Sequence, residues 1–157
     1  MFYINQSVDL NFSRPTHVKI YTVKGDTLTR QIKANVYDGS AMVSVESGGT
    51  QQFNQCIVMY QRPDGSFGQY DYDEGYDDAL AVTTQPAPSG NSVWFLLRPE
   101  MVARAGTVKV WLYFNGGSSI AETNGLRTFP FEIEVADCPY FNPEEPDYDP
   151  LAPEPEE

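Results

Sequence analysis

Residues 108–114 read Val-Lys-Val-Trp-Leu-Tyr-Phe, so that aliphatic and phenyl side chains alternate with longer polar or aromatic ones. Successive side chains of an extended strand point to opposite faces, and this period of two therefore indicates a strand with one buried face. The same alternation recurs in residues 28–36 and in residues 131–135. Further strands, rich in β-branched and aromatic residues, are expected at 18–23, 41–45, 53–61 and 92–97.

Turn-forming residues separate these segments. They are Lys24-Gly25-Asp26, Asp38-Gly39, Ser47-Gly48-Gly49, Pro63-Asp64-Gly65 and Asn115-Gly116-Gly117. One stretch, residues 99–105, is expected to form a short helical connector, because Pro99 suits a first helical turn and Gly106 suits a helix end. Many short strands without a longer helix predict an all-β fold, a two-sheet antiparallel β-sandwich. We place the sandwich at residues 17–137, after an N-terminal extension of residues 1–16.

The charge of the chain is unevenly distributed. Its 157 residues, enough for one domain, hold 22 acidic and 10 basic side chains, for a net charge of −12. Residues 138–157 contain seven acids, six prolines and no base, and residues 71–78 contain five acids and no base. The remainder is close to neutral and offers no basic patch, so we expect no binding to nucleic acid. No apolar run is long enough to cross a bilayer, so we expect no membrane partner.

The acidic, proline-rich tail of residues 138–157 is expected to be extended, because prolines at this density prevent both helices and central strands. Its aromatic residues are Tyr140, Phe141 and Tyr148. Two readings stay open for them. Tyr140 and Phe141 pack on the base of their own domain, or the segment docks on another subunit.

The sequence offers little support for an enzyme, a zinc site or a cofactor. His17 is the only histidine, and no serine lies in a Gly-x-Ser-x-Gly turn that would expose a nucleophile. No glycine-rich phosphate-binding motif is present. A calcium site is a weak candidate in the acidic segment, where hard cations would find clustered oxygen ligands in Asp71, Asp73, Asp77 and Asp78. We therefore expect no catalysis, no cofactor and no resident metal.

The chain has two cysteines, and the sequence leaves open whether they form a disulfide. Cys56 lies in an apolar run and is expected to be a small buried side chain, whereas Cys138 lies where the strand pattern ends.

A carbohydrate-binding module is an alternative function, because aromatic side chains on one sandwich face would form a platform for sugar rings. The candidates for that platform are Tyr70, Tyr72, Tyr76, Trp94, Trp111 and Tyr113.

The order of several motifs resembles a known family. The motifs are Val23-Lys24-Gly25-Asp26-Thr27, the segment from Arg30 to Gly39, Tyr60-Gln61-Arg62-Pro63-Asp64-Gly65-Ser66, Val93-Trp94-Phe95-Leu96-Leu97, the segment from Glu100 to Gly106, and Thr128-Phe129-Pro130-Phe131-Glu132-Ile133-Glu134-Val135. Together they resemble the N-terminal immunoglobulin-like domain of upper baseplate proteins from tailed phages of Gram-positive bacteria, over residues 17–136.

This resemblance implies an immunoglobulin-like sandwich and a structural role as a tail or baseplate adaptor. Such proteins dock on the tail hub and carry receptor-binding proteins, but this chain has only the acidic tail where a helical linker and distal domain would follow. The expected partners are tail hub, baseplate or capsid subunits, with homo-oligomerisation in the particle. The expected location is the virion, assembled in the cytoplasm of the bacterial host, since the N-terminus lacks a secretory signal pattern. A capsid decoration or head-fibre protein with the same fold is the closest alternative.

Overall fold

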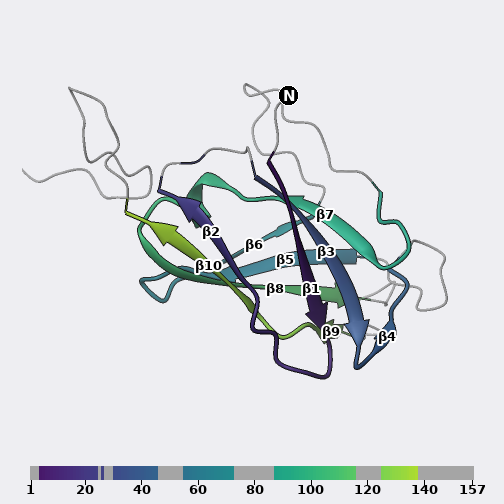
Figure 1. The fold of residues 1–157 in the computed structure, drawn as a ribbon. Coiled ribbons are helices and arrows are strands. Elements are labelled where there is room, and N and C mark those ends of the chain that lie inside the picture. The colour runs from purple at the N-terminus through teal and green to yellow at the C-terminus, as the bar shows by residue number, and fades with distance from the viewer. Residues whose placement is uncertain are drawn as a thin grey trace, which may run out of the picture.

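The protein forms two β-sheets that face each other across one hydrophobic core (Figure 1). A computed structural model describes residues 4–24, 26, 30–45, 55–72, 87–115 and 125–137. Within these residues there are ten strands and one turn of 3-10 helix, η2 (Pro99–Met101). The predicted all-β sandwich is confirmed.

The smaller sheet is built around one central strand, β3 (Arg30–Asp38). Its neighbours are β1 (Ile4–Asn11), β4 (Ala41–Met42) and β7 (Ser92–Leu96). The larger sheet has the order β2 (Lys19–Val23), β10 (Phe131–Ala136), β8 (Gly106–Asn115), β5 (Gln55–Gln61) and β6 (Phe67–Asp71). A short strand, β9 (Gly125–Arg127), pairs with the end of β8.

Both sheets are mixed, which corrects the prediction of purely antiparallel sheets. β1 runs parallel to β3, and β2 runs parallel to β10. The cause is a double crossing, because the chain passes from β1 in one sheet to β2 in the other and returns to the first sheet as β3 (Figure 1). The sandwich therefore begins at β1, and the predicted boundary at residue 17 is too late. Residues 4–11, assigned to an N-terminal extension, supply Val8 and Leu10 to the core.

The core lies between the inward faces of the two sheets. The largest fully buried side chains are Phe95, Phe114, Phe131, Leu10, Ile32, Met101, Leu112 and Ile133. Those of β8 and β10 occupy every second position, as the alternation predicted. Cys56 is buried among them, as predicted.

The predicted helical connector is a single turn that closes one end of the sandwich. Met101 and Val102 are both 1% exposed and fill this end of the core. The Tyr70 hydroxyl donates to the Leu96 carbonyl at 2.6 Å, and the Arg98 guanidinium lies 4.1 Å from the centre of the Tyr70 ring. Burial raises the pKa of Tyr70 well above its usual value, although Arg98 acts to lower it. Gly106 then reverses the chain at a φ of 129°, which an L side chain rarely adopts.

Candidate interaction surface

The outward face of the larger sheet carries an exposed group of apolar side chains, here called the aromatic patch and formed by Met59, Phe67 and Trp111. Met59 and Trp111 are direct partners in adjacent strands. The rings of Phe67 and Trp111 meet edge to face, with centroids 6.5 Å apart and planes inclined by 79°. Phe67 is 70% exposed, the largest exposed fraction among the large apolar side chains of the described residues. The strand pattern creates the patch, since all three occupy outward positions of β5, β6 and β8.

Trp111 is held in place by its apolar surface rather than by hydrogen bonding. Its indole N–H is buried and finds no acceptor within the described part of the chain. A buried tryptophan usually satisfies this donor, so the position gains nothing from the nitrogen. The neighbouring outward residues Gln61 and Gln69 are uncharged. The aromatic patch is thus an apolar centre bordered by these neutral residues and, two residues from Trp111 on β8, by the exposed Lys109.

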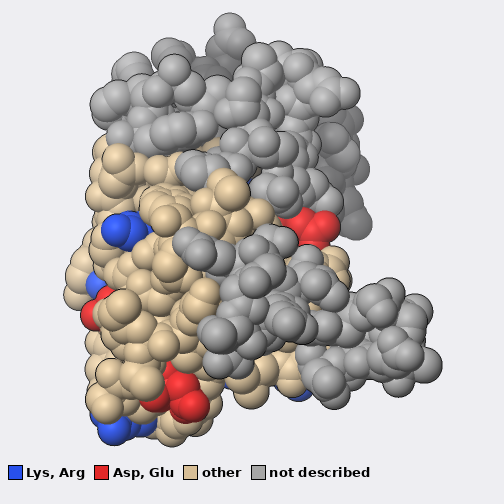
Figure 2. All heavy atoms as spheres, turned by 90° about the vertical axis from the view of Figure 1, so that its right-hand side faces the viewer, with Lys and Arg blue, Asp and Glu red and all other residues tan. Residues whose placement is uncertain are grey.

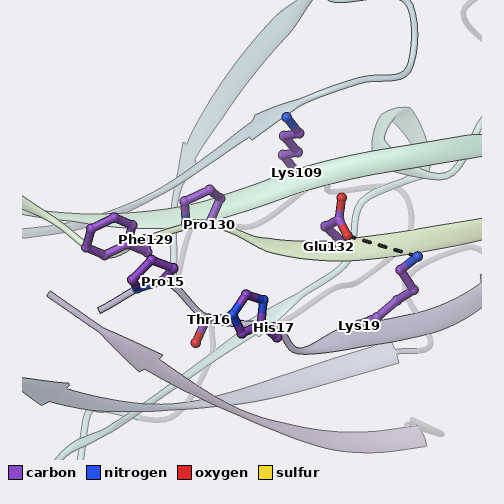
Figure 3. Close-up of a pocket in the computed structure, with 8 residues that line it drawn as sticks. All are labelled: Pro15, Thr16, His17, Lys19, Lys109, Phe129, Pro130 and Glu132. Carbon is purple, nitrogen blue, oxygen red and sulfur yellow. Dashed lines mark ion pairs between the residues drawn. The ribbon is translucent and has the colours of Figure 1, made fainter. Parts of the chain in front are cut away.

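A hollow of about 310 Å³ opens on the same face, at the edge formed by the beginnings of β2 and β10. Its lining residues are Pro15, Thr16, His17, Lys19, Lys109, Phe129, Pro130 and Glu132 (Figure 3). Phe129, Pro15 and Pro130 lie together on one side of it, whereas Lys19, Glu132 and Lys109 lie along the other. The hollow therefore combines flat apolar rings with two ammonium groups and one carboxylate.

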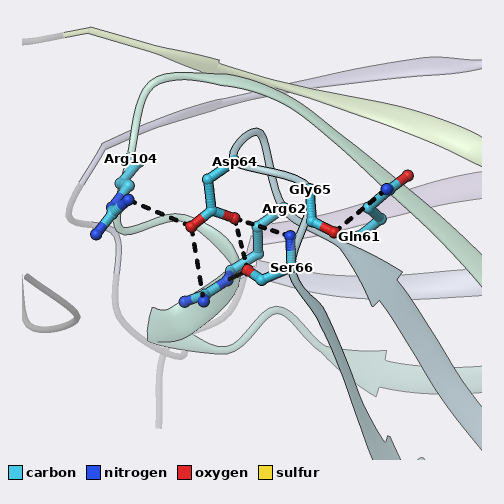
Figure 4. Close-up of polar contacts among 6 residues, drawn as sticks. All are labelled: Gln61, Arg62, Asp64, Gly65, Ser66 and Arg104. Atoms are coloured by element: carbon cyan, nitrogen blue, oxygen red, sulfur yellow. Dashed lines mark hydrogen bonds and ion pairs between the residues drawn. The ribbon is translucent and has the colours of Figure 1, made fainter.

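The Pro63-Asp64-Gly65 turn, predicted from the sequence, joins β5 to β6 and is fixed by a polar cluster (Figure 4). Asp64 accepts a hydrogen bond from the Ser66 N–H at 3.0 Å and one from Arg104 at 3.3 Å. These bonds, those from Ser66 first, lower the pKa of Asp64. Arg62 donates to the Ser66 hydroxyl at 2.6 Å. Because Asp64 and Ser66 already engage both guanidinium groups, we interpret this cluster as a structural clamp on the turn.

The outward face of the smaller sheet differs, because its polar side chains bond to one another. Ser92 donates to Asn35 at 2.7 Å, and Asn35 donates to Asp9 at 3.1 Å. The Trp94 ring is covered by Lys33, whose Nζ lies 5.8 Å from the ring centre. This face presents mostly polar groups that bond to one another, together with one exposed apolar side chain, Met42 of β4, which is 67% exposed.

The six aromatic residues considered as a sugar platform do not come together. Trp111 and Tyr113 lie on the outward face of the larger sheet, but Trp94 lies on the opposite side of the sandwich. Tyr70 is buried, and Tyr72 packs against the core. Tyr76 lies outside the described residues. Tyr113 itself lies against Gly125 of β9, where a Cβ atom would come within 1.9 Å of the tyrosine oxygen.

The other candidate residues are mostly beyond what the structure describes. Of the calcium candidates, Asp71 ends β6 and accepts a hydrogen bond from Gln55 at 3.1 Å. The other three, Asp73, Asp77 and Asp78, fall outside the described residues, as do Tyr140, Phe141, Tyr148 and Cys138. Within the described ranges no cluster of three or more potential metal ligands occurs. His17 is exposed on the rim of the hollow.

Most residues of the aromatic patch and the hollow carried no prediction of a site from the sequence, and Phe67 and Phe129 are the most exposed aromatic ones among them. Phe67 was missed because its short strand, with Gly68 and a single buried residue, Tyr70, gives a weak alternation. Phe129 lies in the motif of residues 128–135, whose alternation predicts a strand but no role for Phe129 itself. The usable signal was Phe129-Pro130, an aromatic residue next to a proline immediately before a strand.

Charge in the described part of the chain is nearly balanced, with ten basic and nine acidic side chains. In the side view of Figure 2, basic and acidic groups appear in small separated areas on a mostly uncharged surface. Asp26 ties the two sheets together, since it accepts from Thr22 of β2 and from Arg30 of β3, both at 2.6 Å. Although partial burial acts to raise it, these bonds lower the pKa of Asp26. In the ranges that the structure covers, no helix is long and apolar enough to span a bilayer.

Comparison with known proteins identifies a relative by fold alone. No known family model matches the chain, and no curated protein is significantly similar to it in sequence. Among solved structures, the N-terminal domain of phage TP901-1 ORF48 superimposes with a TM-score of 0.56 at 10% sequence identity. The match covers 83% of this chain and 97% of that domain. The chain is therefore similar in fold to nearly the whole of a phage protein domain.

Proposed function

We propose that the chain is a structural protein of a phage virion, a docking module of the tail or baseplate that acts through protein–protein contacts. The observation that carries this proposal is the shared fold, since the similar domain belongs to a baseplate protein and is covered almost completely. The aromatic patch supplies a physical basis for docking. A role carried by contacts also agrees with the 70% exposure of Phe67 in this patch.

The aromatic patch has the composition that protein interfaces favour at their centres. Aromatic residues and methionine are enriched there, and charged residues are depleted. A few such side chains supply most of the binding energy, while polar neighbours exclude water around them. Phe67 would contribute most per residue, because it has the most apolar area left to bury.

We propose a structural rather than an enzymatic role, without cofactor or metal. His17 is the only histidine of the chain, and the neighbouring Thr16 hydroxyl donates to the Asp9 carbonyl at 2.9 Å instead of facing a base. The proposed partners are other virion proteins, with several copies of this chain in the particle, and neither nucleic acid nor a membrane. The proposed location is the virion, after assembly in the host cytoplasm.

The proposal is tested by deleting the gene from a phage that encodes this chain and examining the particles by electron microscopy. We expect filled heads and tails with an incomplete baseplate, restored by the intact chain supplied in trans. A chain with Phe67→Ser is expected to restore poorly, whereas one with Lys33→Gln, on the opposite face, restores fully. Particles with an intact baseplate would contradict the proposal. Heads that lack surface protrusions would favour a capsid decoration protein, and complete particles that adsorb poorly would favour glycan binding.

A further inference from the structure

One row of side chains crosses the outward face of the larger sheet from the hollow to the aromatic patch. In adjacent strands, Lys19 pairs with Glu132, Glu132 with Lys109, Lys109 with Gln61, and Gln61 with Phe67. With neighbouring strands about 4.8 Å apart, the row is about 19 Å long. The hollow and the aromatic patch are therefore two ends of one continuous surface, which we call the cross-strand row.

The basic end of this row is available to an anionic group. Two lysines face a single glutamate in the hollow, on a chain whose net charge is −12. Lys19 lies 4.0 Å from both Glu132 and Glu134, at the limit of an ion pair. Lys109 forms no ion pair with any of the described residues and is exposed. An incoming carboxylate would therefore meet ammonium groups that are weakly engaged.

The apolar rings at the two ends of the cross-strand row, Phe129 in the hollow and Phe67 in the aromatic patch, suit proline and tyrosine. Phe129, 37% exposed, lies beside Pro15 and Pro130 in the hollow. An exposed phenyl ring beside two prolines offers a flat apolar surface to an extended proline-rich segment, whose conformation costs little entropy to fix. An occupant that matches the whole row is thus an extended peptide that carries prolines, carboxylates and an aromatic ring.

The chain itself contains one segment of this chemistry. Residues 143–150 read Pro-Glu-Glu-Pro-Asp-Tyr-Asp-Pro, with four carboxylates, three prolines, one tyrosine and no base. About six residues of an extended proline-rich chain, at about 3.1 Å each, span the length of the row. Charge, ring chemistry and length therefore point to the same occupant.

A second copy of the chain is the better source of this segment than the same copy. The hollow lies at the beginning of β10, where Pro130 and Glu132 line it, whereas β10 itself runs away from the hollow and ends at Ala136. Docking in the same copy would require residues 137–142, at most about 20 Å when fully extended, to make a full turn and also to return about 13 Å along β10 to Glu132. We propose that residues 143–150 of one copy dock along the cross-strand row of a second copy. Such a head-to-tail contact builds a ring or an open chain of subunits.

The test measures the mass of the full-length protein by light scattering over a wide concentration range at low and high salt. We expect association that increases with concentration and weakens at high salt, because carboxylates meet lysines. The hollow variant Lys19→Gln/Lys109→Gln and the tail variant Glu144→Lys/Glu145→Lys should each associate about tenfold or more weakly than the unmodified chain. Lys33→Gln, on the opposite face, is the matched control and should associate normally.

Mixing the two variants gives the sharpest result. Each carries one intact half of the contact, so we expect a 1:1 pair that grows no further. Thermal unfolding of each variant verifies that it is folded. A chain that stays monomeric at all concentrations, or a hollow variant that associates like the unmodified chain, would overturn the inference. A monomeric chain that still completes phage particles would overturn this inference alone and leave the proposed function intact.

Discussion

The two outward faces of the sandwich differ in how far their aromatic side chains are covered by neighbouring residues. On the smaller sheet, Asn35, Ser92 and Asp9 bond to one another, and Lys33 covers Trp94. On the larger sheet, Phe67 packs edge to face on the half-buried Trp111 and is itself left 70% exposed. Because the inward faces of both sheets are apolar, burial of the core does not account for the difference between the two outward faces. Exposed apolar groups of this kind are typical of contact sites, which agrees with the docking role proposed for the aromatic patch.

The largest expected effect tests whether the inward faces are indeed equivalent. Phe95 belongs to the smaller sheet and Phe131 to the larger one, and both are 0% exposed. We expect Phe95→Ala and Phe131→Ala each to lower the free energy of unfolding by about 3–5 kcal/mol, because each leaves a cavity in a closed core. Urea denaturation measures both values. A loss below about 1 kcal/mol at either position would show that the two sheets do not share one core.

The next effect separates the two outward faces by their tryptophans. Trp111→Ala and Trp94→Ala each remove a half-buried ring and should lower the free energy of unfolding by about 1–2 kcal/mol. Only Trp111→Ala should weaken docking on phage particles, by about tenfold or more, because only that ring lies in the aromatic patch. Co-sedimentation of the purified variants with particles that lack the chain measures docking. Equal weakening by the two variants would remove the distinction between the faces.

The stability contributed by Asp26, whose hydrogen bonds join the two sheets, should depend on pH. The folded pKa of Asp26 is lowered by its bonds to Thr22 and Arg30, so its contribution to stability is complete above the unfolded pKa, about 3.9, and is lost as pH falls through the folded pKa. Asp26→Asn should therefore lower the free energy of unfolding by about 1–2 kcal/mol at pH 7 and by much less at pH 3. Denaturation at both pH values measures the gap. A gap that is independent of pH would contradict the assignment.

The smallest effect on stability is expected for Phe67. Since this side chain is 70% exposed, Phe67→Ser should change the free energy of unfolding by no more than about 0.5 kcal/mol. A loss of docking by this variant would then be a property of the surface and not of the fold. A destabilisation of 2 kcal/mol or more would show that Phe67 serves folding, which would weaken the argument for the aromatic patch.

The sequence predicted the central strands well, because long alternations such as residues 108–114 depend only on local pattern. It missed β1, in which Gln6 interrupts the inward apolar positions, and β6, in which Gly68 occupies one. It also missed the parallel pairs, since β1 and β3 are brought together by a crossing through the other sheet. The immunoglobulin-like character drawn from the resemblance stays a prediction.

The surface was harder to predict than the core. Trp111 and Tyr113 were recognised as aromatic residues of a strand, but nothing local shows which strands flank them. Phe67 reaches Trp111 only because β5 lies between β6 and β8. Trp94, which was grouped with them as a platform candidate, belongs to β7, and β7 pairs with β3 in the smaller sheet. Strand order, which long-range pairing sets, therefore decided the membership of the aromatic patch.

The most direct test of the docking surface uses the two tryptophans, one on each outward face, as reporters. The chain contains only these two, so Trp94→Phe leaves Trp111 as the single reporter and Trp111→Phe leaves Trp94. Acrylamide quenching of tryptophan fluorescence is measured for each variant, free and bound to phage particles that lack the chain. We expect binding to protect Trp111 from quenching and to leave Trp94 as accessible as before. Protection of Trp94 with no change at Trp111 would contradict this expectation.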